Sequence, residues 1–156
     1  MATKRIDLKG YIYQQINISS ILSILGEVTT RNRRIYSGWP QEQPELSATE
    51  PAEGWLCFHE LSSLKAFNGS HIEDHTIQFN IWSTLQSNND NVIDVLDSLF
   101  DNPSVDQYGI SITDDWVILL TQRITTNEMY EEAIKMYRKM VNYQMRTTKI
   151  PFRVGA

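Results

Sequence analysis

The pattern of apolar residues alternates between the two-residue period of a β-strand and the period of a helix. The clearest change lies in "HTIQFNIWSTLQSNNDNVIDVLDSLF", residues 75–100, where polar and apolar residues nearly alternate from Thr76 to Ser83. After "QSNNDN" the apolar residues follow a helical stripe from Val92 to Phe100. Ser, Asn and Asp are typical of helix N-termini. The segment therefore predicts a half-buried strand that leads into an amphipathic helix at about 89–101.

The N-terminal segments predict short elements. Residues 6–26 carry apolar residues at helical spacing and predict two short helices. We expect the second helix to be capped by Ser19 and Ser20 and to end at Gly26, because these residue types favour the two ends of a helix. "RRIYSG" then predicts a brief extended piece.

The middle of the chain predicts a β-hairpin. Residues 55–66 have apolar side chains at both parities, which is typical of a strand that is central or has its second face covered. Asn68-Gly69 is a strong hairpin signal, because both turn residues must reach positive φ. We therefore expect the strand at 55–66 to pair antiparallel with one at 71–84.

The C-terminal third predicts strands at 109–113 and 116–125, and then an ambiguous segment at 134–147. Its Glu, Lys, Met and Ala content favours a helix by intrinsic propensity. Four large residues of one parity favour a strand instead, and periodicity leaves both interpretations open. These residues are Tyr137, Val141, Tyr143 and Met145.

Length and composition are those of one domain. The chain has 156 residues, of which 41% are apolar, enough for a single core. We expect the domain to span 1–150, followed by a loose tail at 151–156. The stretch 37–54 has three prolines, four glutamates and no basic residue, and predicts a long surface loop anchored by Trp39. No apolar run is long enough to span a membrane, so no membrane partner is expected.

Charge is strongly separated along the chain. The net charge of −5 combines +4 over residues 1–36, −13 over 37–115 and +4 over 116–156. These charges either form a solvated surface or let unlike patches meet between copies of the protein. The acidic balance and the lack of a basic stripe interleaved with aromatics argue against nucleic-acid recognition.

Few residues carry the patterns of known chemistry. Cys57, His59, His71 and His75 lie on the two strands of the predicted hairpin, so a metal- or ligand-binding domain is one alternative function. Their spacing matches no common zinc pattern, and we expect no metal and no cofactor. The sequence has no phosphate-cradling glycine loop, nucleophile elbow or zinc-protease motif, so we do not expect an enzyme.

The order of elements resembles the tail terminator, or tail completion, proteins of long-tailed bacteriophages. The resemblance lies in "ILSILGEV", in "RRIYSGWP" opening into a proline-containing loop, in "IQFNIWST" followed by a helix, and in "MYRKMVNYQMRT" near the end. The loop at 37–54 is longer and more acidic than is usual in that family.

The resemblance implies an α+β fold and a structural role in the virion. It implies a mixed, mostly antiparallel sheet of about four to five strands with helices packed on one face, and it favours a strand at 134–147. It also implies a ring, of about six copies, that caps the tail tube, stops its polymerisation and joins it to the head. The expected partners are other copies of the chain, the tail tube protein and a head-completion or connector protein. The expected location is the head-proximal end of the virion tail, after assembly in the host cytoplasm. An intracellular adaptor unrelated to viruses is a further alternative.

The charged residues suggest where copies would meet. We expect the basic groups of "RNRR" at 31–34 and of the last strand to face acids of the loop at 42–53 or of the 89–101 helix on a neighbour, because a ring needs two unlike patches. The predicted interface residues are Arg31, Arg33, Arg34, Trp39, Glu42, Glu45, Glu50, Glu53, Asp90, Asp94, Asp97, Arg138, Lys139 and Arg146.

Overall fold

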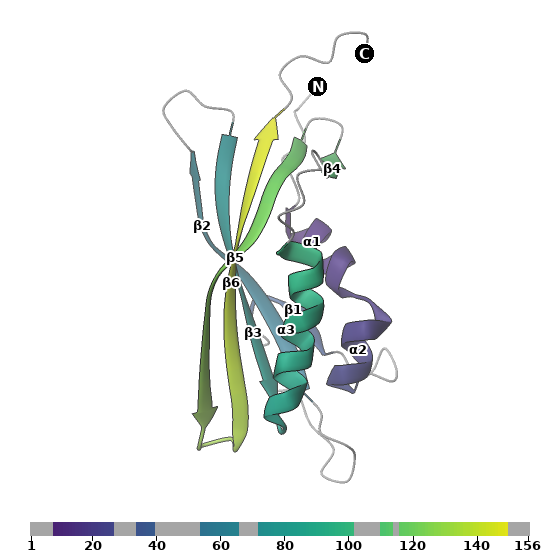
Figure 1. Ribbon diagram of the computed structural model, residues 1–156, viewed down its shortest axis with the longest axis vertical. Coiled ribbons are helices and arrows are strands. Elements are labelled where there is room, and N and C mark those ends of the chain that lie inside the picture. Colours follow the sequence, from purple (N-terminus) through teal and green to yellow (C-terminus); the bar gives the residue numbers. More distant parts are fainter. Residues whose placement is uncertain are drawn as a thin grey trace.

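The protein is an α+β domain with its helices on one face of a strongly twisted sheet, as Figure 1 shows. The computed structural model describes residues 8–26, 34–39, 54–65, 72–101, 110–113 and 116–149. The fold class and the position of the helices on one face are as predicted. Among the described residues the sheet has six strands, because a short strand pairs at each edge of four long ones; about four to five were expected.

The sheet has the strand order β1-β2-β3-β6-β5-β4. The strands are β1 (Ile35–Ser37), β2 (Gly54–Lys65), β3 (Ile72–Ser83), β4 (Ile110–Thr113), β5 (Trp116–Glu131) and β6 (Met136–Lys149). Within the described chain β1 pairs parallel with β2, and the other neighbours pair antiparallel. The sheet is therefore mixed and mostly antiparallel, and the β2–β3 hairpin is confirmed. Its predicted turn at Asn68-Gly69 lies outside the described residues.

The ambiguous segment at 134–147 forms strand β6. It pairs with β3 on one side and β5 on the other over nearly its whole length. Val141, Tyr143 and Met145 are fully buried against the helices, so the shared parity of these residues marks the core face. Hydrogen-bond ladders on both sides and burial of one face outweigh the helical propensity of its Glu, Lys and Met residues.

Helices α1 (Leu8–Ile16) and α2 (Ser19–Leu25) confirm the two short N-terminal helices. Gly26 ends α2 in the left-handed conformation at φ 82°, and its N–H donates to the carbonyl of Leu22. The predicted cap is wrong, because Ser19 is already helical and Ile18 occupies the N-cap without a side-chain hydrogen bond.

Helix α3 (Gln86–Phe100) begins three residues earlier than predicted, so the polar run forms its first turns. Asn89 explains why: it is buried, and its Nδ2 donates to the backbone carbonyl of Tyr137 at 3.0 Å. A residue type that favours caps in isolation here fixes α3 to strand β6.

The core between helices and sheet is organised around Phe79 on β3. Its ring lies 5.9 Å from Phe58, 5.7 Å from Phe100 and 5.6 Å from Tyr143, measured between centroids. These contacts join strands β2, β3 and β6 to the end of α3. Aromatic pairs at such distances add to the free energy gained by apolar burial, so this cluster holds α3 against the sheet.

Candidate interaction surfaces

The face of the sheet opposite the helices carries a second, smaller cluster around two tryptophans. Trp55 on β2 and Trp82 on β3 are directly opposite each other, and their rings stack with centroids 5.1 Å apart. Cys57 and Met136 are buried with them. This cluster explains the apolar residues at both parities of β2, since one set contacts the main core and the other contacts the tryptophans.

Trp39 packs on the edge of this cluster. Its ring lies 4.5 Å from that of His59 and 5.6 Å from that of Trp82, between centroids. The guanidinium of Arg138 lies 4.9 Å from the Trp82 ring and 5.6 Å from the Trp39 ring. Trp39 therefore contacts the helix-free face of its own chain, while 57% of its surface stays exposed. The rest of the predicted loop, residues 40–53, lies outside the described part.

The basic residues of β6 that were predicted at the interface have acidic or polar partners within their own chain. Arg138 donates two hydrogen bonds to Asn80 Oδ1, at 3.2 and 2.8 Å, and one to Glu131 Oε1 at 3.1 Å. Arg146 donates to both carboxylate oxygens of Asp74, at 2.8 and 3.1 Å. Their predicted contacts with a neighbour would therefore require an exchange of partners.

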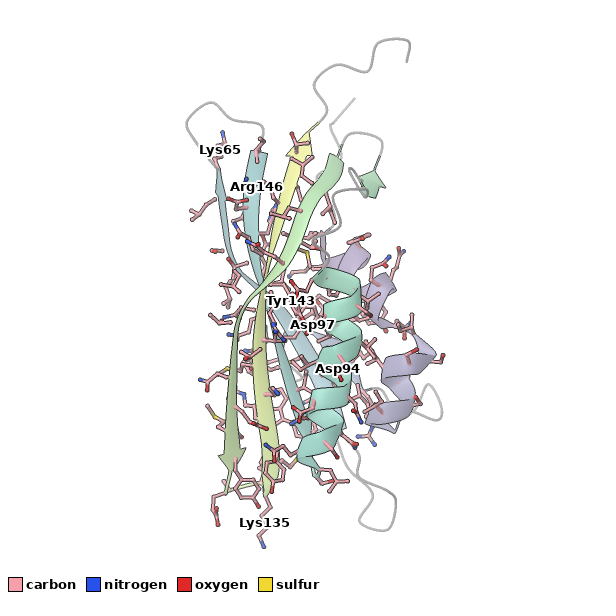
Figure 2. All side chains as sticks on the ribbon, in the orientation of Figure 1. Lys65, Asp94, Asp97, Lys135, Tyr143 and Arg146 are labelled. Carbon is pink, nitrogen blue, oxygen red and sulfur yellow. The ribbon has the colours of Figure 1, made fainter. Side chains whose placement is uncertain are left out.

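The acids of α3 are also mostly engaged. Asp90 accepts a hydrogen bond from Lys139, and Asp97 lies between α3 and the sheet. Asp94 is the exception: it is exposed, and its carboxylate has no hydrogen bond or ion pair among the described residues. Figure 2 shows Asp94 and Asp97 on the same helix. The contact of these acids with a neighbouring copy stays a prediction, and Asp94 is the best placed for it.

Asp97 has two partners from the sheet. It accepts the hydroxyl of Tyr143 at 2.6 Å on Oδ1 and Nη1 of Arg123 at 2.8 Å on Oδ2. Burial, and next the hydrogen bond to Asp97, raise the pKa of the Tyr143 phenol. The phenol therefore stays neutral and acts as a donor.

Arg34 differs from the exposed interface residue that was predicted. Only 2% of its surface is exposed. A reversal of charge at this position would bury a carboxylate and disturb the fold, so it would not test an interface. The other predicted interface residues lie outside the described residues: Arg31, Arg33, Glu42, Glu45, Glu50 and Glu53.

The alternative metal site is opposed by the geometry of the β2–β3 hairpin. Cys57 Sγ lies 3.6 Å from His59 Nε2 on the helix-free face. His75 lies on the opposite, helix-covered face, where its Nδ1 contacts Glu60 Oε1 at 2.7 Å and its Nε2 contacts Thr147 Oγ1 at 3.0 Å. The sheet itself separates His75 from the other two potential ligands.

Two further observations bear on this site. Burial raises the pKa of Cys57 to about 12, so the thiolate form that binds metals is disfavoured. Within the described ranges no three His, Cys, Asp or Glu side chains gather in a way that could hold an ion. His71 lies outside those ranges.

A set of exposed apolar residues on two strands was not predicted from the sequence. Leu61 and Leu64 on β2 are 53% and 66% exposed, and Ile124, Met129 and Tyr130 on β5 are also exposed. In "HELSSLK" the two leucines, Leu61 and Leu64, break the alternation expected of a half-buried strand. This break was the sequence signal that could have indicated exposed apolar residues. Only the strand order shows that both strands lie near an edge of the sheet.

A groove follows the edge of β2. It has a volume of about 490 Å³ and is lined by Lys9 of α1, by Gly38 and by residues 58–63 of β2. No helix in the described part of the chain is both long and apolar enough to cross a membrane.

Comparison with known proteins shows a fold rather than a family. No model of a known protein family matches the sequence. No curated protein matches it either. A chain in the solved virion of a native gene transfer agent particle has a similar structure, with a TM-score of 0.59. The similarity covers 90% of this chain and 94% of that chain at 9% sequence identity, so the two share a fold over nearly their whole lengths.

Proposed function

We propose that this chain is a structural protein of a phage or phage-like virion. It assembles into a ring of about six copies that caps the tail tube, ends its polymerisation and joins it to the head. It acts by binding alone, with the tail tube protein on one side and a head-completion or connector protein on the other. Its place is the head-proximal end of the tail, and it reaches that place from the host cytoplasm.

The fold similarity to the virion chain carries this proposal. The similarity extends over 90% of one chain and 94% of the other, so both consist of the same α+β unit with little added. Since one fold can serve many functions, the order of elements shared with tail terminator proteins supplies the particular role. The strand at 136–149 agrees with that order.

The charge distribution supports a ring with two unlike contact surfaces. In a ring each copy offers a different patch to each neighbour, and the patches must be complementary. The middle of the chain carries −13 and each end carries +4. Asp94 offers a carboxylate without a partner among the described residues on the outer side of α3. Such contacts weaken as salt screens them.

The first test is the solution mass, measured by light scattering after size exclusion over a range of protein, salt and magnesium concentrations. We expect a species of six times the 18.1 kDa of one chain, and electron micrographs that show closed rings. Asp94→Lys should weaken this assembly more than Asp94→Asn, which removes the charge without reversing it.

The second test adds the purified protein to the polymerising tail tube protein of the same virus. We expect tubes that stop growing and carry a ring at one end. Tubes of unchanged length that leave the protein free in solution would overturn the role as a cap.

A further inference from the structure

The sheet has two long strand edges that its own short strands leave uncovered. Strand β1 pairs with β2 only from Leu56 to Phe58. Strand β4 pairs with β5 only from Trp116 to Ile118. Among the described strands none pairs with the outer edge of β2 at 59–65 or of β5 at 124–130. We call these two segments, 59–65 of β2 and 124–130 of β5, the free edges.

Both free edges carry exposed apolar side chains among their polar and charged ones. Each includes a β-bulge whose extra residue is an exposed aliphatic side chain: Leu61 on β2 and Ile124 on β5. Proteins usually protect an exposed edge with lysine, proline or a short strand, because a free edge pairs readily with another chain. On the free edges Leu64, Met129 and Tyr130 are exposed as well. These exposed apolar side chains favour a partner that covers them, because their burial would be favourable.

The space beside the free edge of β2 has room for a strand. The groove begins where β1 ends, at Gly38, whose N–H donates to the carbonyl of Phe58 at 2.8 Å. It continues along β2 to Ser63. An added strand would therefore lie in line with β1 and extend the sheet. This is the geometry of β-augmentation, in which backbone hydrogen bonds supply the affinity.

The backbone of β2 is oriented for this pairing. Leu56 donates its N–H outward to the carbonyl of Arg34, so even-numbered residues face the outer edge in this part of β2. The bulge between Glu60 and Ser62 shifts that parity by one residue. Beyond it, Ser63 and Lys65 direct their backbone groups outward.

The direction of the strands fits a second copy of the chain. Strands β2, β3, β6 and β5 each run antiparallel to the next, so β2 and β5 run in opposite directions. All copies in a ring keep the same orientation about its axis. Strand β5 of one copy therefore meets β2 of the next in antiparallel pairing, the more stable kind.

The lengths also match. The free edges have the same number of residues, and antiparallel pairing places His59 near Tyr130 and Lys65 near Ile124. In this pairing β1, which belongs to the copy that supplies β2, lies past the β5–β6 turn of the other copy. Strand β4 of that other copy lies past Lys65 of the first. Neither short strand therefore obstructs the contact. Figure 2 shows Lys65 and Lys135, which mark the outer ends of β2 and of the β5–β6 hairpin, at opposite ends of the molecule.

We propose that the free edge of β2 binds the free edge of β5 from a second copy, so that one β-sheet continues from subunit to subunit. The proposal rests on the proposed function for the common orientation of the copies and for the closure of these contacts into a ring. It assigns the subunit interface to backbone pairing and the exposed apolar residues, in addition to the separated charges.

The test uses two variants, Ser63→Cys and Asn127→Cys, one of them isotopically labelled, and a short bifunctional maleimide reagent. Both positions are exposed, and the native Cys57 is fully buried. We expect a mixture of the two to form a cross-link between labelled and unlabelled chains, while neither variant forms one alone. The control pair replaces Asn127→Cys by Ser20→Cys, an exposed position on α2, a helix that packs on the core face of the sheet and belongs to neither free edge.

A second measurement compares three substitutions of exposed aliphatic residues. Leu64→Lys and Ile124→Lys should weaken assembly at least about tenfold, because each places a charge on a pairing edge. Leu85→Lys, whose native side chain is 52% exposed at the start of α3, should leave assembly unchanged. Light scattering over a concentration series measures all three.

The outcomes separate this inference from the proposed function. Cross-links within one variant alone would indicate a twofold dimer and overturn the inference, as would a cross-link only to the tail tube protein. Absence of the mixed cross-link at the highest attainable concentration would overturn it too. Capped tubes without the mixed cross-link would support the capping role and overturn the strand-edge interface. The mixed cross-link without capping would support the strand-edge interface and overturn the capping role.

Discussion

The hydrogen bond from Tyr143 to Asp97 gives the most direct test of how α3 is held on the sheet. The phenol is fully buried, and its hydroxyl donates to Oδ1 of Asp97 at 2.6 Å. Tyr143→Phe keeps the ring and its contacts with Phe79 and Phe100 but removes this donor. Asp97 keeps Arg123 as a partner, and its side chain is 24% exposed, so water can replace part of the lost bond.

The expected loss follows from these contacts. A hydrogen bond to a charged group contributes about 1.5–3 kcal/mol to stability, and partial exposure of the carboxylate places Tyr143→Phe near the middle, at about 2 kcal/mol. For a chain of this size that loss should lower the melting temperature by roughly 4–8 °C. Urea unfolding followed by tryptophan fluorescence measures the free energy of unfolding.

Tyr130→Phe is the matched control. Its ring is 47% exposed on β5, and removing an exposed hydroxyl should change the free energy of unfolding by less than about 0.5 kcal/mol. Equal stability of the two variants would refute the reasoning, because it would mean that the bond between β6 and α3 adds nothing beyond ring packing.

Three further predictions concern other parts of the sheet. The hydrogen bond from Arg146 lowers the pKa of Asp74. The pair therefore stabilises the fold at any pH above the ordinary carboxyl pKa, and this stabilisation is lost as the pH falls through the lowered pKa of Asp74. Asp74→Asn should lower the free energy of unfolding by less than about 1 kcal/mol at neutral pH, because both side chains are partly exposed, and should have no effect at acid pH. Urea midpoints measured across pH test this. Gly54→Ala should destabilise by about 1–3 kcal/mol, since an added Cβ would lie 2.1 Å from the carbonyl oxygen of Trp82, and a circular-dichroism melt would detect it. Burial and nearby basic groups lower the pKa of His59, so stability should fall as the pH drops below 6.5 and His59→Gln should reduce that fall, as seen in melting temperature against pH.

The elements with strong local signals were predictable from the sequence. The β2–β3 hairpin, the helix after it and the glycine stop of α2 all follow from periodicity or from one residue's backbone preference. Strand β6 could not be predicted in this way, because intrinsic propensity describes each residue without its neighbours in the sheet. Its identity as a strand depends on Phe79 and Ile77 of β3 lying opposite Val141 and Tyr143.

The candidate interface was harder to predict for the same reason. Charge counts show that Arg146 and Asp74 exist, but only the register of β3 against β6 shows that they face each other in one chain. The exposed position of Leu61 likewise follows from a bulge and from the strand order. Interfaces made of strand edges depend on where each strand lies in the sheet, and a sequence pattern reports this only indirectly.

The buried thiol of Cys57 has a practical consequence. It is fully covered beneath the tryptophan cluster, and its raised pKa keeps it protonated. A thiol reagent can therefore react with it only when this region opens, and the rate of reaction counts those openings without any introduced label. If contacts with neighbouring copies stabilise the sheet, the rate of thiol modification should fall as subunits assemble. The native cysteine would then report how much assembly stabilises this region.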